Sequence, residues 1–268
     1  MFTSWLGLLA SAFRVRGKGE SPAAGVPASP APAPANPAPI SPWPRPTPAE
    51  YYLTGSEISK VREFRPAYET AADAVGIVPG STPSARLPWQ ALAALHYMEA
   101  RFLSRVKTPG GPFQLDPGGT GDELLRRIRG QVADICGKYN RPIGDIETDF
   151  ATAVLVAAHH LIGKVRIQPY PDDDLDTILA DAFWGYNGRA KFHTATGESA
   201  GGPPSWQYSP YVNNHPKAGR SFRVQGTIPD DTVPGGRRRI DRVSTSPGAL
   251  IIYQELIARD SELAPPVA

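Results

Sequence analysis

Apolar residues recur at three- and four-residue steps along much of the chain from residue 50 onward, which is the spacing of one face of an α-helix. The first such stripe follows Thr54-Gly55-Ser56-Glu57, which fits a capping box because glutamate stands three residues after threonine. We expect Pro66 to break or kink this helix, because proline lacks the amide donor. The stripe consists of Val61, Phe64, Tyr68, Ala71 and Val75.

The next two helices are marked by their first residues. Pro88 opens one helix, since proline is well tolerated in a first turn. Thr120-Gly121-Asp122-Glu123 fits a second capping box and predicts another helix there. One face of that helix is apolar and consists of Leu125, Ile128, Val132, Ile135 and Tyr139.

A fourth helical segment is apolar on nearly all sides, from a cap at Asp145 to about Val165. Such a helix belongs in the centre of a domain. A fifth helix begins near Asp174 and ends at Gly188, a common stop residue, and Ser246-Pro247 starts a last one. Because no strong alternating strand pattern is found, the fold class is predicted to be mainly α.

The residues before this helical region have a different composition. Residues 1–20 join a short apolar run to basic residues, and residues 21–49 alternate proline with alanine. The apolar run is too short to span a bilayer and has the reverse order of a secretory signal. Two interpretations of it remain: contact with a membrane surface through residues 1–18, or a docking peptide or disordered tail. The proline-rich segment predicts a disordered, extended linker, followed by one globular domain over residues 50–262 and a tail over residues 263–268.

Net charge and cysteine content exclude only a few classes of function. The formal net charge of +2 is too small to indicate nucleic-acid binding, so no nucleic-acid partner is predicted. A single cysteine, Cys136, excludes an intramolecular disulfide and is expected to be buried. We interpret the basic run Arg237, Arg238, Arg239 with Arg242 as a solvated loop, with contact to an anionic polymer as the alternative.

One residue breaks the apolar stripe of the helix after Pro88. The stripe runs through Leu92, Leu95, Phe102 and Val106, and the missing member of the series is Glu99. A carboxyl group on an apolar face is costly unless it is paired or protonated. Its burial favours the protonated form, which is the form a general acid needs. The alternative is a salt bridge to Arg101 or Arg105, or exposure of Glu99.

Sequence around and after Glu99 resembles the motifs of the soluble lytic transglycosylase and goose-type lysozyme family. Glu99-Ala100-Arg101-Phe102 is similar to the E-S-x-F motif, and residues 111–117 fit G-x-x-Q-[ILV]-x-P. Residues 182–188 resemble A-x-x-x-Y-N-x-G, and Tyr211-Val212 resembles the closing Tyr-Val. Ala100 replaces the usual serine, which indicates a divergent branch.

The resemblance implies a lysozyme-like domain that cleaves the bond between N-acetylmuramic acid and N-acetylglucosamine in peptidoglycan. Glu99 would act as acid and then as base, either for the sugar's own 6-hydroxyl or for water. The residues expected to bind the glycan are Phe113, Gln114, Tyr186, Asn187 and Tyr211. Tyr186 could equally belong to the core, and Asn187 could equally terminate a helix.

A hydrolase would need a second carboxylate, for which Asp116, Asp145 and Asp149 are candidates, although helix capping or a turn explains them as well. No metal or cofactor is predicted. We expect peptidoglycan strands as partner, and the cell envelope or a phage virion as location. The rival interpretations are a non-catalytic glycan-binding protein, a structural protein of a virion or envelope, or the same chemistry on chitin.

Overall fold

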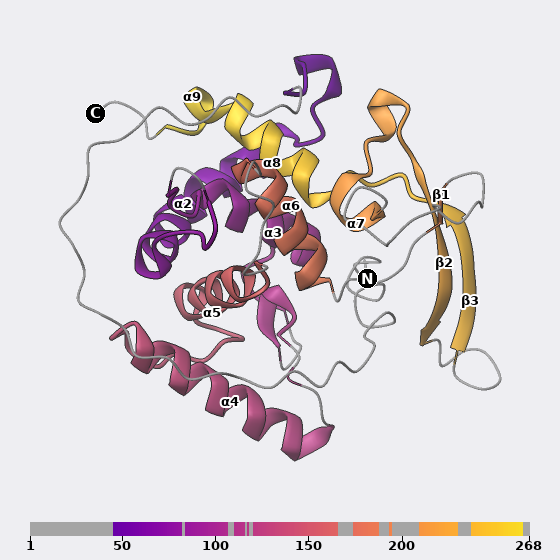
Figure 1. Cartoon of the computed structure of the whole chain (residues 1–268). Helices are drawn as coiled ribbons and strands as arrows, with labels where there is room; N and C mark the ends of the chain where they lie inside the picture. Colours follow the sequence, from indigo (N-terminus) through magenta and orange to yellow (C-terminus); the bar gives the residue numbers. More distant parts are fainter. Residues whose placement is uncertain are drawn as a thin grey trace.

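The computed structural model describes residues 45–81, 84–106, 110–115, 117, 120–165, 174–187, 193–194, 209–229 and 237–264. Within them the chain is mainly helical, as predicted (Figure 1). The predicted N-terminal segment and residues 21–44 of the predicted linker lie outside the described residues. The helices are η1 (Pro48–Glu50), α2 (Gly55–Val75), α3 (Trp89–Ala100), η2 (Gly111–Phe113), α4 (Gly121–Lys138), α5 (Phe150–Gly163), α6 (Leu175–Tyr186), α7 (Pro210–Asn213), η4 (Pro216–Ala218), α8 (Ala249–Ala258) and α9 (Asp260–Leu263). The strands are β1 (His193–Thr194), β2 (Phe222–Pro229) and β3 (Arg237–Val243).

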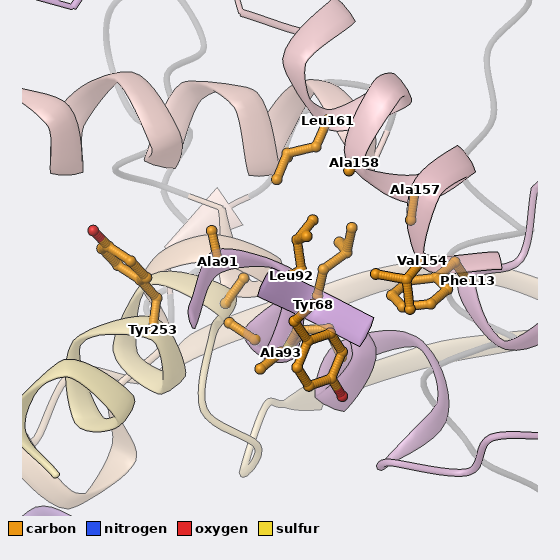
Figure 2. Packing of buried hydrophobic residues seen from close by; sticks show 14 of the residues in the cluster. Tyr68, Ala91, Leu92, Ala93, Phe113, Val154, Ala157, Ala158, Leu161 and Tyr253 are labelled. Atoms are coloured by element: carbon orange, nitrogen blue, oxygen red, sulfur yellow. The ribbon is translucent and has the colours of Figure 1, made fainter. Parts of the chain in front are cut away.

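Helix α3 is the most enclosed of the longer helices described. Eleven of its twelve residues are buried, and it packs against both α2 and α8. Figure 2 shows side chains from α2, α5 and α8, among them Tyr68, Leu161 and Tyr253, gathered around α3. Alanines at 91, 93 and 94 have no exposed surface, and their small side chains let neighbouring elements approach closely. Helix α5, the segment predicted to be central, also belongs to this core.

Helix α2 confirms the first capping box but not a break at its proline. The Thr54 hydroxyl accepts the Glu57 amide at 3.3 Å, and the Glu57 carboxylate accepts the Thr54 amide at 2.8 Å. Of the two expected effects of Pro66, a break or a kink, the break does not occur, because α2 continues through it to Val75. Apolar residues on both sides of Pro66, including Val61 and Tyr68, are buried in the core. This packing outweighs the loss of one amide donor.

Two predicted helix starts need correction. Thr120 precedes α4 as expected, but its side chain makes no capping hydrogen bond, so the second capping box does not form. Helix α5 begins at Phe150 and is capped by Asp149 rather than Asp145. Asp145 instead accepts the Glu147 amide in the turn before the helix, at 2.9 Å.

The predicted loop at Arg237, Arg238, Arg239 and Arg242 is wrong as well, because these residues lie in β3. Strands β2 and β3 pair antiparallel over residues 223–229 and 237–243, and β1 pairs with the start of β2. The strand signal was present in the alternation of Phe222, Val224 and Ile228, but Gly226, Pro229 and the arginine run weaken it. None of the described helices is long and apolar enough to cross a membrane.

The buried carboxylate of Glu255 links the start of the domain to helix α8 by hydrogen bonds. Glu255 has no exposed surface and accepts the backbone amides of Tyr52 at 2.7 Å and Leu53 at 3.0 Å. Arg259 donates both to Glu255 at 3.2 Å and to the Leu53 carbonyl at 3.1 Å. Burial raises the pKa of Glu255, although these hydrogen bonds and the charge of Arg259 act in the opposite direction.

We predict that Glu255 makes stability fall as pH rises above the usual carboxyl range. The folded protein holds the proton more tightly than the unfolded chain, so the contribution is lost as pH rises through the raised pKa. Urea unfolding from about pH 4 to about pH 7 should show wild type losing free energy of unfolding relative to Glu255→Gln. Glu262→Gln, which removes an exposed partner of the same arginine, should lack this trend. A difference between wild type and Glu255→Gln that is constant or rises with pH would contradict the prediction.

Candidate active site

Glu99 lies in the last turn of α3 and is 4% exposed. The expected continuation of this helix to Phe102 and Val106 is wrong, because α3 ends at Ala100. Arg101 and Phe102 both adopt positive φ angles, 50° and 60°. Left-handed conformations in non-glycine residues are costly and are often found at functional sites. The burial of Glu99 nevertheless agrees with the interruption of the apolar stripe.

Phe102 and Arg101 pack back onto the helix that they leave. Phe102 is 1% exposed, and its ring contacts His96 and Tyr97, with ring centroids 5.6 Å apart in both pairs. The Arg101 guanidinium lies over the Tyr97 ring, 4.0 Å from its centroid, and donates to the Ser246 hydroxyl at 3.2 Å. These contacts stabilise the sharp turn directly after Glu99.

Tyr211, from the Tyr-Val motif, contacts Glu99 directly. Its hydroxyl donates to Oε1 of Glu99 at 2.5 Å, across 112 positions of sequence. Tyr211 stands near the start of α7 and is 8% exposed. Two residues expected to share a site are therefore in direct contact.

Gln114 contacts Glu99 from a second direction. Its side-chain amide donates to the backbone carbonyl of Glu99 at 2.7 Å. Gln114 follows the short helix η2 and also has a positive φ, 52°. Gly111 makes this turn possible: its φ is 62°, and a Cβ there would lie 2.4 Å from the Ile146 carbonyl oxygen. The Gln114 side chain, which was expected to contact the glycan, thus donates to the end of α3.

Tyr186 and Phe113 are also brought together, but not as two sugar-binding surfaces. The Tyr186 hydroxyl donates to the Phe113 carbonyl at 2.9 Å. Phe113 is 1% exposed and packs against His96 and Phe150, with ring centroids at 5.1 and 6.2 Å. The expectation that the Phe113 ring binds glycan is therefore wrong, because the ring is covered by the core.

Asn187 serves to end helix α6. It is the C-cap residue, its backbone amide donates to the Phe183 carbonyl at 3.1 Å, and it is 9% exposed. Of its two interpretations, helix termination is the one the structure bears out. Gly188, the expected stop residue, lies outside the described residues.

His96 is the residue of this region that the sequence patterns did not single out. It has no exposed surface, and its Nδ1 and Nε2 lie 2.7 Å from the Tyr68 hydroxyl and 2.9 Å from the Leu103 carbonyl. A carbonyl can only accept, so Nε2 carries the hydrogen and Nδ1 accepts from Tyr68. Burial lowers the pKa of His96 to about 4, which keeps the ring neutral. Its position three residues before Glu99, close to the same helix face, was the available signal.

Two of the three acidic residues weighed as a second carboxylate have structural roles. Asp149 accepts the Ala151 amide at 3.1 Å and the Thr152 hydroxyl at 2.7 Å. Asp145 holds a turn, as described above, and Asp116 lies outside the described residues. Across the described ranges, no group of three or more His, Cys, Asp or Glu side chains is arranged to hold a metal ion. Cys136 is buried, as expected.

No protein-family model, curated protein or solved structure matches this chain.

We predict that Tyr68→Phe destabilises the fold by about 1–3 kcal/mol, because it leaves the buried Nδ1 of His96 without a donor. Tyr139→Phe is the matched control, since that hydroxyl contacts Nδ1 of His159 at 3.0 Å in a half-buried position. Urea unfolding should show a clearly larger loss for Tyr68→Phe. Equal losses would mean that the His96 hydrogen bond has no special weight.

Proposed function

We propose that this chain is a peptidoglycan-cleaving glycosidase of the lytic transglycosylase or lysozyme kind, with Glu99 as its acid and base. One observation supports this most strongly: the separate motifs of the family resemblance converge around one carboxyl group. Tyr211 donates to the side chain of Glu99, Gln114 donates to its backbone, and Tyr186 holds the residue before Gln114. Motifs that matched by chance would have no reason to meet in space.

The environment of Glu99 suits proton transfer to a leaving oxygen. Its side chain is 4% exposed, so the carboxyl group is largely shielded from water. The Tyr211 hydroxyl donates to Oε1, which orients the carboxyl group that carries the proton. In the proposed reaction this proton passes to the glycosidic oxygen as the bond from C1 of N-acetylmuramic acid to that oxygen breaks.

The Glu99 carboxylate then takes up a proton from the nucleophile. In a transglycosylase the nucleophile is the 6-hydroxyl of the same muramic acid, which closes a 1,6-anhydro ring. In a lysozyme it is water, and a second carboxylate usually assists. The capping and turn contacts of Asp149 and Asp145 account for both residues, and Asp116 lies outside the described residues.

We predict that Glu99→Gln abolishes cleavage and leaves the fold intact, because it removes the proton donor and keeps the shape. The test is digestion of purified peptidoglycan followed by mass spectrometry of the released fragments. Products one water lighter than lysozyme products identify a transglycosylase, and ordinary reducing ends identify a hydrolase. The control is Glu69→Gln, which removes a carboxylate that pairs with Arg65 on α2 and should leave the products unchanged.

Full activity of Glu99→Gln would refute the assignment of the acid. A wild-type protein that releases no fragments would point instead to a glycan-binding or structural protein of an envelope or virion. Cleavage of chitin in preference to peptidoglycan would keep the chemistry and change the substrate.

We predict that Tyr211→Phe lowers kcat by roughly ten- to hundredfold, because a hydrogen bond to an ionisable group contributes about 1.5–3 kcal/mol. KM should change little, since the hydroxyl contacts the acid. Initial rates on soluble glycan fragments measure both constants. A rise in KM alone would place Tyr211 in substrate binding.

A further inference from the structure

The loop of residues 244–248, between β3 and α8, is bonded to both segments that meet at the candidate active site. The Ser246 hydroxyl accepts from Arg101, two residues after Glu99, at 3.2 Å. On the other side, the Ser246 carbonyl accepts from the side chain of Asn214, the residue after α7, at 2.5 Å. The loop thus links the segment that carries the candidate acid to the helix that carries its hydrogen-bond donor.

Gly248, the last residue of this loop, is buried where the backbone of α7 meets the start of α8. Its amide donates to the Asn214 carbonyl at 2.8 Å. A Cβ at this position would lie 2.2 Å from the Val212 carbonyl oxygen and 2.7 Å from the Asn213 amide nitrogen. Both neighbouring atoms belong to the backbone, so no side-chain rotation could relieve the overlap.

Gly248 is required for space rather than for backbone conformation. Its φ of −84° and ψ of 166° are extended values that any residue can adopt. An alanine would therefore keep the path of the loop and push against α7. Because nonbonded carbon atoms pack best at about 3.5 Å, relief of a 2.2 Å approach needs a displacement of roughly 1 Å.

The displacement would fall on α7 rather than on α8. The first residues of α8, Ala249 and Leu250, are 0% and 1% exposed, and α8 packs against α3. Helix α7 has only four residues and packs beside α8 and α6 (Figure 1). Tyr211 precedes Val212 in α7, so the two residues would shift together. A shift of that size is enough to take the Tyr211–Glu99 hydrogen bond, now 2.5 Å, outside the range of about 2.5–3.0 Å for bonds between oxygen atoms.

We propose that Gly248 is a positioning residue for the candidate acid. The lack of a side chain there sets how closely α7 approaches α8, and thereby the distance from the Tyr211 hydroxyl to the Glu99 carboxyl group. The catalytic meaning of this inference rests on the proposed function, whereas the contact itself can be tested without catalysis. In a glycosidase the contact orients the carboxyl group toward the glycosidic oxygen, and a misplacement of about 1 Å can lower a rate by about a hundredfold.

The first test follows the Tyr211 ring by NMR in the full chain, with tyrosine labelled by ¹³C at Cζ. The Tyr211 signal is the one lost in Tyr211→Phe. In the wild type it should move on Glu99→Gln, because the hydroxyl donates to that side chain. In Gly248→Ala the signal should be displaced, and the addition of Glu99→Gln should move it much less. A response to Glu99→Gln as large as in the wild type would overturn the proposal.

Gly144→Ala is the matched control for a steric clash. A Cβ there would overlap the Asp149 carboxylate, which is held by two hydrogen bonds at the start of α5. This variant should unfold at a lower temperature and leave the Tyr211 signal in place. If Gly248→Ala does not fold, Ser246→Ala removes the bond to Arg101 and should displace the Tyr211 signal by a smaller amount. No displacement in Ser246→Ala would also contradict the proposal.

Cleavage rates give the second test. Gly248→Ala should lower kcat about as much as Tyr211→Phe does, by roughly ten- to hundredfold, with KM nearly unchanged. The double variant should be no slower than Tyr211→Phe alone, because both changes remove the same contact, and additive losses would refute the positioning role. A wild type that cleaves nothing while the NMR response is as expected refutes only the proposed function. A wild type that cleaves while Gly248→Ala keeps the response refutes only the positioning role.

Discussion

The burial of a carboxyl group at the end of the most enclosed long helix is the constraint on which the rest of this structure depends. Helix α3 is buried along nearly its whole length, and Glu99 comes one residue before its end. A carboxyl group in that position is tolerated only if polar groups reach it. Tyr211 supplies a donor to the side chain, and Gln114 supplies one to the backbone. Elements distant in sequence must therefore meet at this helix end.

A layer of hydrogen bonds and aromatic rings holds this meeting point in place. His96 ties the chain after α3 to helix α2 through Leu103 and Tyr68. The Phe113 ring packs on His96, and the Phe113 carbonyl accepts from Tyr186 of helix α6. Displacement of any one of these helices would strain contacts made by the others. Sites of this kind are positioned by rigid elements rather than by free loops.

The sequence predicted the elements better than their ends. The burial of Glu99 and the start of α2 followed from spacing alone, because periodicity and capping are local properties. The end of α3 did not, since the left-handed turn at Arg101 and Phe102 packs back onto rings of α3 and is also bonded to the hydroxyl of Ser246, which is distant in sequence. Asp145 and Asp149 are equally good caps by type, and only packing selects between them. Family resemblance placed Tyr211 among the glycan-binding residues, but its contact with Glu99 was not predicted, as no local pattern links positions 112 residues apart.

The hydrogen bonds that join residues 52 and 53 to Glu255 have a mechanical consequence. The backbone amides of residues 52 and 53 donate to a fully buried carboxylate on α8, and Arg259 donates to the Leu53 carbonyl. A pulling force on the chain before residue 50 is therefore transmitted to α8, the helix that packs directly on α3. It does not act first on the start of α2. Tension would be borne by several hydrogen bonds in parallel. The domain could be held under load from its N-terminal side while the end of α3 keeps its geometry.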